Sequence, residues 1–368
     1  MAVAVRKLGN FLRGDVVLSV ALILACASCL IAPPNAGYFK YIDFYTLSLL
    51  FCLMLVVEGL REQRVFQYLG ALVLSKVNTD RGIIATLVFL CFLSSMFITN
   101  DVALITFVPF AIMILKMAGL TANICLTITL MTLAGNLGSM FTPIGNPQNL
   151  YLYSISNLNL LEFLRLMAPY TLLSALLLGG AIYLAYRPAP IAIQPQNLKL
   201  RNRRLIIFYA LLFGLCLLTV AGFLPYTLLL LLVSGAIFWR NRSLLTRIDY
   251  SLLLTFVFFF IFVGNLNHLD SLKSFIMELL SNHERLVCVW TSQIISNVPA
   301  AMLLANYTGD VRELIIGTNL GGLGTLIASM ASLISYKQLI TSYPQLKKSY
   351  LITFTIFNLL FLAALLAI

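Results

Sequence analysis

Long apolar stretches recur along the chain from residue 16 to residue 367. They are continuously apolar and do not alternate with polar positions as surface strands do, so they predict helices. Most are long enough to cross a bilayer, where only helices and closed barrels satisfy their own backbone groups. The uninterrupted stretches are 16–32, 44–60, 167–186, 205–222, 224–239, 250–266 and 350–367.

Four further apolar stretches are interrupted by polar or helix-breaking residues. Gly, Asn and Thr interrupt 122–153 and 314–335, whereas a polar tip divides 82–116 and 286–309. Because 286–309 is too short for two crossings, we interpret both stretches with a polar tip as re-entrant hairpins. If 82–116 formed two full spans instead, the topology downstream would not change. The pattern predicts an all-α polytopic membrane protein with about nine crossings and two re-entrant hairpins.

Composition and charge support a membrane protein and give its orientation. Of 368 residues, 61% are hydrophobic and 10% are charged, which is too few charges for a soluble domain of this length. The net charge of +11 does not indicate a nucleic-acid partner, because the basic residues lie in short segments between apolar stretches. With the N-terminus in the cytoplasm, 19 of the 24 lysines and arginines fall on the cytoplasmic side. We therefore expect an integral plasma membrane protein (the inner membrane in a bacterium) with its C-terminus outside.

Two parts of the sequence resemble each other in order. Ile98-Thr99-Asn100 matches Ile295-Ser296-Asn297, and Asn136-Leu137-Gly138 matches Asn319-Leu320-Gly321. In the expected topology the two repeats have opposite orientations, and inverted repeats with interrupted helices at matching places are typical of secondary transporters. The expected organisation is an N-terminal segment and first span (1–43), repeat 1 (44–186), a basic cytoplasmic linker (187–204), and residues 205–367, which comprise two connecting spans (205–239) and repeat 2 (250–367).

The interruptions supply the candidate site. Gly and Pro break helices and free carbonyl oxygens, which bind sodium together with Asn and Thr oxygens, while helix N-termini hold anionic groups. The alternative is that these residues only join helices by packing and hydrogen bonding. The candidate substrate- and ion-binding residues are Thr99, Asn100, Asp101, Asn136, Thr142, Pro143, Gly145, Asn146, Asn149, Ser296, Asn297, Asn319, Thr325 and Ser329. The candidate sodium ligands among them are Asn100, Asn136, Asn297 and Asn319.

Asp101 is the only acid in these stretches, and Val298 stands at the matching position of repeat 2. A carboxylate within the membrane is costly and indicates a function, here binding a cation or carrying a proton. The alternative is a helix cap, which is also how we interpret Asp43 and Asp249 at matching span starts. The seven cysteines lie in apolar stretches and fit packing rather than a metal site. No cofactor is expected beyond a sodium ion or proton as the coupling ion.

At these residues the chain resembles the ion transporter superfamily, which includes arsenite permeases, sodium/proton antiporters, citrate–metal permeases and divalent-anion/sodium symporters. Thr142–Asn149 resembles the Gly-x-Pro-x-Asn signature of the arsenite and citrate branches. Within the superfamily the chain looks closest to uncharacterised anion or citrate-type permeases. The resemblance implies one half-site from Thr99, Asn100 and 136–149 and another from Ser296, Asn297 and 319–332. It also implies a homodimer and an elevator-like movement.

The chain departs from the Ser-Asn-Thr tip of the divalent-anion branch. It has Thr99-Asn100-Asp101 at one tip and Ser296-Asn297-Val298 at the other. The extra negative charge argues against a dicarboxylate and leaves room for proton coupling, a metal-complexed anion or a neutral oxyacid.

The leading hypothesis is a secondary active transporter of a small anionic solute, coupled to sodium or protons. Sodium/proton exchange and arsenite efflux are the alternatives within the superfamily. The chain has no phosphate-binding Gly-x-x-x-x-Gly-Lys-Ser/Thr run, so we do not expect it to hydrolyse ATP. An intramembrane protease needs two acids at membrane depth and a metalloenzyme needs a His or Cys cluster, so no enzyme is expected. An ion channel fits an inverted repeat less well than a carrier does.

Overall fold

A computed structural model describes residues 16–191, 199–281 and 283–368. The predicted cytoplasmic N-terminus (1–15) and the middle of the basic linker (192–198) lie outside the described residues. Within the described ranges the chain is almost entirely helical, and its only strand-like pairing is an isolated bridge between Thr79 and Pro190. The all-α prediction is confirmed.

The α-helices follow one another with short connections. They are α2 (Val16–Ser28), α3 (Phe44–Glu62), α4 (Val65–Leu74), α5 (Asp80–Ile98), α6 (Asn100–Met117), α7 (Ile124–Ser139), α8 (Pro147–Ile155), α9 (Leu160–Ala185), α10 (Arg203–Val220), α11 (Tyr226–Asn241), α12 (Tyr250–Leu266), α13 (Asp270–Leu280), α14 (Glu284–Ile295), α15 (Asn297–Leu304), α16 (Val311–Leu320), α17 (Met330–Ser342) and α18 (Lys347–Leu366). Short 3-10 turns are η1 (Ala36–Lys40), η2 (Thr121–Asn123), η3 (Arg242–Thr246) and η4 (Pro344–Leu346).

Eight helices in the described part of the chain are long and apolar enough to cross a membrane, or nine if α12 and the sharply bent α13 count as one span. This confirms a polytopic membrane protein with about the expected number of crossings. The set of helices that qualify as spans differs from the prediction, however. The stretch 16–32 is helical only over Val16–Ser28, which is short for a crossing, while α5 and α6 each qualify as a span. The re-entrant geometry of 82–116 therefore stays a prediction, whereas α14 and α15, with 12 and 8 residues, are too short to cross.

The helices of the two repeats occur in the same order. A long helix (α3 or α12) leads to a short helix (α4 or α13), then a hairpin, a broken helix and a final long helix (α9 or α18). The first helix of each repeat begins at the expected cap: Asp43 Oδ1 accepts a hydrogen bond from Thr46 N, and Asp249 Oδ1 accepts one from Leu252 N, each at 3.1 Å. Opposite membrane orientation of the two repeats stays a prediction.

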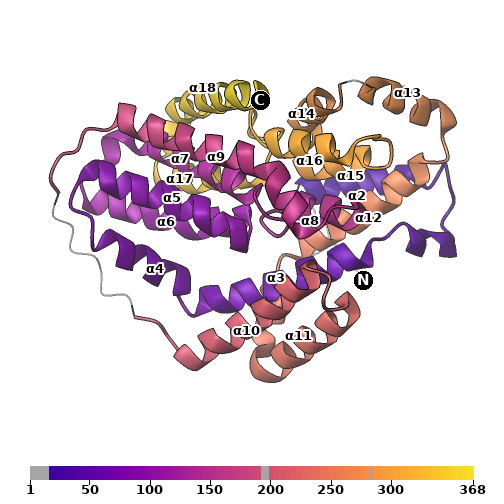
Figure 1. Ribbon diagram of the computed structural model, residues 1–368, viewed down its shortest axis with the longest axis horizontal. Helices are drawn as coiled ribbons and strands as arrows, with labels where there is room; N and C mark the ends of the chain where they lie inside the picture. Colours follow the sequence, from indigo (N-terminus) through magenta and orange to yellow (C-terminus); the bar gives the residue numbers. More distant parts are fainter. Residues whose placement is uncertain (1–15, 192–198, 282) are drawn as a thin grey trace, which may run out of the picture.

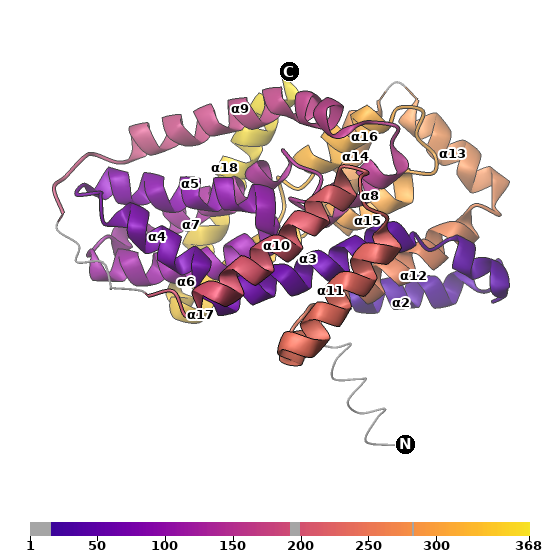
Figure 2. The same ribbon diagram turned by 60° about the horizontal axis from the view of Figure 1, so that its bottom comes forward.

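The helices form two groups that meet in the middle of the molecule. Figures 1 and 2 show α5, α6 and α7 together toward one end of the long axis, and α2, α12 and α13 toward the other. Helices α10 and α11 pack on α3 along one side. The short helices α4 and α13 lie toward opposite ends of the long axis. Between the two groups, α8 contacts both α3 and α15.

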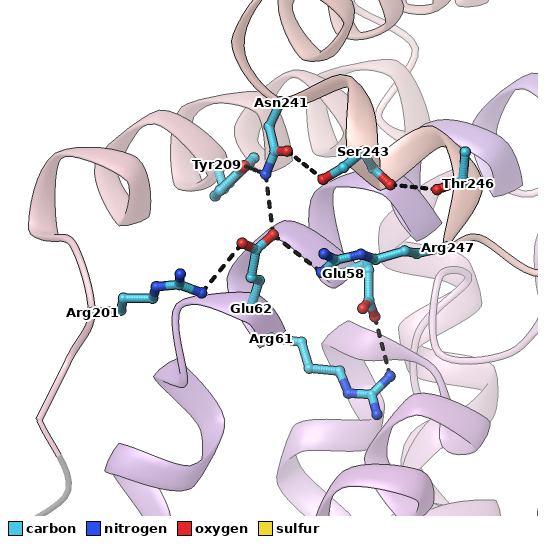
Figure 3. A network of polar contacts seen from close by, with 9 residues as sticks. All are labelled: Glu58, Arg61, Glu62, Arg201, Tyr209, Asn241, Ser243, Thr246 and Arg247. Carbon is cyan, nitrogen blue, oxygen red and sulfur yellow. Dashed lines mark hydrogen bonds and ion pairs between the residues drawn. The ribbon is translucent and has the colours of Figure 1, made fainter.

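Glu62, the last residue of α3, joins segments that are far apart in the sequence (Figure 3). Its two carboxylate oxygens each lie 3.5 Å from an arginine, one to Arg201 and the other to Arg247. Asn241 Nδ2 donates to the same carboxylate at 3.1 Å. The end of the basic linker and the segment before α12 are therefore both held to the end of α3.

Candidate functional site

The two hairpins have tips of the same backbone conformation. Thr99 has φ 65° and ψ 150°, and Ser296 has φ 74° and ψ 154°. Residues other than glycine rarely adopt a positive φ, and such a conformation costs about 1–3 kcal/mol unless the surroundings hold it in place. Its occurrence at the same point in both repeats shows that each tip is fixed by its neighbours.

Each tip is held by the unwound segment of the broken helix in its own repeat. Asn100 N donates to the carbonyl oxygen of Gly145, and Asn297 N donates to that of Ala328, both at 3.0 Å. These pairs occupy corresponding positions in the two repeats. The first residue of α6 and the first residue of α15 are thereby fixed beside the first residues of α8 and α17.

A second matching pair of contacts joins the unwound segment of each broken helix to the first arm of the hairpin in the same repeat. Thr142 Oγ1 donates to the carbonyl oxygen of Met96, and Thr325 Oγ1 donates to that of Gln293 at 3.4 Å. In repeat 1 the broken helix and the hairpin arm also approach each other closely. A Cβ atom on Gly138 would lie 2.1 Å from the Phe92 carbonyl oxygen, so a side chain there would force the broken helix away from the hairpin.

Buried carboxamides join the two repeats reciprocally. Asn319 Oδ1 accepts from Asn146 Nδ2 at 3.0 Å, and Asn319 Nδ2 donates to Asn149 Oδ1 at 2.6 Å. In the corresponding arrangement, Asn136 Oδ1 accepts from Ser329 Oγ at 3.0 Å, and its Nδ2 donates to Ser332 Oγ at 3.3 Å. Each broken helix thus bonds to the N-cap and the third residue of α8 or α17 in the other repeat, through side chains that are all buried.

Beside these carboxamides lies a small cavity of about 10 Å³, the central cavity, which is large enough for about one water molecule or ion. Its polar lining comes from both repeats, and Leu252 of α12 closes one side. The lining residues are Asn100, Asp101, Pro147, Gln148, Leu252, Asn297, Val298, Ser329 and Met330.

Four helix N-termini converge on the central cavity. Helices α6, α8, α15 and α17 begin at Asn100, Pro147, Asn297 and Met330, and all four of these residues line it. The N-terminal end of a helix carries a partial positive charge, so four of them favour a negatively charged group. One oxygen of Asp101 is buried there without a hydrogen-bond partner among the described residues. The helix ends therefore favour negative charge at the central cavity, and Asp101 favours a cation or proton there.

The fourteen candidate residues take different positions. Asn100, Asp101, Asn297 and Ser329 line the central cavity, and Ser329 also belongs to the carboxamide cluster. Asn136, Asn146, Asn149 and Asn319 form the rest of that cluster beside it. Thr99 and Ser296 form the tips, and Thr142, Pro143, Gly145 and Thr325 belong to the breaks.

The expected sodium ligands are only partly available. Asn136 Oδ1 accepts hydrogen bonds from Asn100 Nδ2 and Ser329 Oγ, and Asn319 Oδ1 accepts one from Asn146 Nδ2. A sodium ion at either oxygen would compete with these contacts.

Two glutamines that the sequence interpretation did not select have clear roles. Gln148 lines the central cavity from the first turn of α8. Gln293 holds the break of repeat 2, because its Nε2 donates to the carbonyl oxygens of Gly321 and Leu323 and its Oε1 accepts from Thr325 N. The signal for Gln293 was its place in an apolar hairpin arm, three residues before Ser296.

Comparison with known proteins agrees with this architecture. The family model described as citrate transporter matches residues 11–313. An uncharacterized transporter of Methanocaldococcus jannaschii is 31% identical over 289 residues, which are 78% of this chain and 79% of the relative. An inner membrane protein of Escherichia coli is 31% identical over 295 residues, 77% of each chain. The silicon efflux transporter of Oryza sativa is 33% identical over only 123 residues, 33% of this chain and 25% of the relative. The chain therefore belongs to the citrate transporter family of membrane transport proteins.

Proposed function

We propose that the protein is a secondary active transporter that moves a small anionic solute, a carboxylate or an inorganic oxyanion, in a cycle coupled to sodium or protons. The observation that carries this proposal is the convergence of four helix N-termini on a cavity whose polar lining consists of Asn, Gln and Ser side chains together with Asp101. Such a site favours negative charge without a fixed cation. At about 10 Å³ the central cavity is too small for a carboxylate, so the solute enters only when the lining moves apart.

Asp101 is the proposed position of the coupling ion. Its unpartnered oxygen lies in the central cavity, whereas Val298 occupies the corresponding position in repeat 2. A carboxylate beside a bound anion would repel it unless a cation or proton were present, which gives coupling a physical basis. The site is therefore proposed to bind solute and coupling ion together.

The test is solute-triggered current in proteoliposomes of the purified protein. Citrate, succinate, sulfate and phosphate are applied under sodium and pH gradients to the parent, to Asp101→Asn and to Asp270→Asn, in which an exposed acid at the start of α13 loses the same charge. We expect a saturable current with counterflow for at least one solute, lost or uncoupled in Asp101→Asn and retained in Asp270→Asn.

Three results would count against this proposal. Sodium-dependent proton movement without any solute current would indicate an exchanger. A parental current in Asp101→Asn would move the coupling ion to the carboxamides. A current that neither saturates nor supports counterflow would indicate a channel.

A neutral oxyacid is the second candidate substrate class. The local likeness to a silicon efflux transporter and the negative charge of Asp101 both favour a solute that carries no charge of its own. Silicic acid and arsenite efflux from the same proteoliposomes under a pH gradient would test it. Uptake or release of either solute with no response to carboxylates or oxyanions would replace the anion proposal.

A further inference from the structure

A second cavity, the vestibule, lies at the opposite ends of three of the helices that line the central cavity. It has a volume of about 290 Å³. Lys40 and Asp43, just before α3, line it together with Asn267 after α12 and Asn306 after α15. Lys40, Asn267 and Asn306 are exposed, so the vestibule opens to the surface that the predicted topology places outside.

The vestibule and the central cavity share three helices. Gln148, Leu252 and Val298, in the first turns of α8, α12 and α15, line the central cavity. Tyr151, Phe260 and Met302, farther along the same helices, line the vestibule. At a rise of 1.5 Å per residue, the two sets are separated by about 5–12 Å along the helices. The two cavities therefore lie in line along one three-helix contact.

Three buried side chains form the floor of the vestibule. The Tyr151 and Phe260 rings meet edge to face, with centroids 5.5 Å apart and planes at 63°. Met302 is 1% exposed and comes from the third helix. On each helix these are the vestibule-lining residues nearest to the central cavity.

The helix dipoles along this line make the central cavity more favourable to an anion than the vestibule, in whose lining Lys40 is the one basic side chain. The vestibule faces the C-terminal ends of α8, α12 and α15, whose partial charge is negative, whereas the central cavity faces the N-terminal ends. Asp43 in the vestibule accepts hydrogen bonds from Thr46 and Ser154. Lys40 forms no ion pair with any described residue, so its ammonium group is available to an anion.

We propose that the vestibule is the outer portal of the transport path. Lys40 attracts a small hydrated anion into it, and Tyr151, Phe260 and Met302 are the gate between the portal and the central cavity. This inference rests on the proposed function for the identity of its ligand, but its geometry is testable without transport.

The first experiment measures access by thiol labelling in intact cells, with the parent's seven cysteines as background. Asn306→Cys is expected to react with a membrane-impermeant maleimide added outside, and Gln148→Cys, beneath the gate, is expected not to react. Adding Met302→Ala or the milder Phe260→Leu to Gln148→Cys should raise its labelling rate several-fold. Labelling of the Asn306→Cys variant only from the cytoplasmic side, or no gain in either gate variant that still reaches the membrane, would overturn the proposal.

The second experiment measures charge and does not depend on a core substitution. The probes are a negatively and a positively charged methanethiosulfonate, each reacting with the Asn306→Cys variant. Adding Lys40→Glu should lower the ratio of anionic to cationic reaction rates by about fivefold at 0.1 M salt. Lys273→Glu, which changes an exposed residue of α13, is the matched control and should leave the ratio unchanged. Equal effects of the two variants would refute a role for Lys40, whereas success of both experiments without any solute current would leave the portal standing and reject the proposed function.

Discussion

The reciprocal carboxamide contacts give a prediction whose size can be worked out from the structure. Asn319→Ala removes the hydrogen bonds to Asn146 and Asn149 and the bond within its own helix to the carbonyl oxygen of Ile315. Asn146 Nδ2 keeps a contact with Ser139 Oγ at 3.3 Å. Asn149 Oδ1 is left without its hydrogen-bond donor in a fully buried position.

The expected loss of stability is about 2–4 kcal/mol. An interhelical hydrogen bond in a membrane protein contributes about 0.6 kcal/mol on average, and two are lost. A buried acceptor left without a donor costs about 1–3 kcal/mol. The cost lies at the low end of this range if the unwound segment before α8 shifts so that Asn149 Oδ1 finds another donor. The larger share of the loss therefore comes from the orphaned oxygen of Asn149.

This origin can be tested by a double-mutant cycle. If the orphaned oxygen dominates, Asn149→Ala added to Asn319→Ala costs less than the sum of the two single losses. The matched control is Asn358→Ala, because Asn358 is also buried but its one side-chain hydrogen bond to a described residue is to the carbonyl oxygen of Phe354 in its own helix. Its substitution should cost little.

The assay follows thermal unfolding of the purified protein in detergent with a thiol-reactive dye, since the buried cysteines react only when the helices separate. Those cysteines are Cys52, Cys91, Cys125, Cys216 and Cys288. Strictly additive losses for Asn149→Ala and Asn319→Ala, or a loss in Asn358→Ala as large as in Asn319→Ala, would refute the reciprocal contact.

Three further predictions concern the packing around the site. Gly138→Ala should lower the unfolding midpoint and the yield sharply, because the new Cβ would overlap the Phe92 carbonyl oxygen. The control is Gly179→Ala, whose new Cβ would have no described atom within 4 Å, and which should be neutral or stabilising by up to about 1 kcal/mol. Glu62→Gln should cost less than about 1 kcal/mol at low salt and nothing measurable at high salt, because the arginine partners of Glu62 are exposed and salt screens their charge. Unfolding midpoints measured at two ionic strengths test this. Arg285→Gln breaks a bidentate ion pair with Glu313 and should reduce stability by about 1 kcal/mol in the same assay. An unchanged midpoint would mean that this pair does not hold α14 to α16.

The family, the helical class and the approximate number of crossings could be predicted from the sequence. Apolar length and the distribution of basic residues are local properties, and the bilayer restricts the backbone to few solutions. The caps at Asp43 and Asp249 were also local, because a capping side chain bonds within three residues. The positions of the breaks followed from Gly, Pro and Asn in the same way.

The tertiary structure decided which polar residues of the site line the cavity and which hydrogen-bond to each other. All the carboxamides looked equally suited to a ligand in the sequence, but Asn136, Asn146, Asn149 and Asn319 bond across the repeats while Asn100 and Asn297 face the central cavity. Residues 170 or more positions apart meet there, and no periodicity encodes such a contact. The same holds for Gln148, for Leu252 and for the vestibule. Sequence determined which segments break inside the apolar stretches. Packing of the two repeats decided which polar groups hydrogen-bond to each other across the repeats and which line the central cavity.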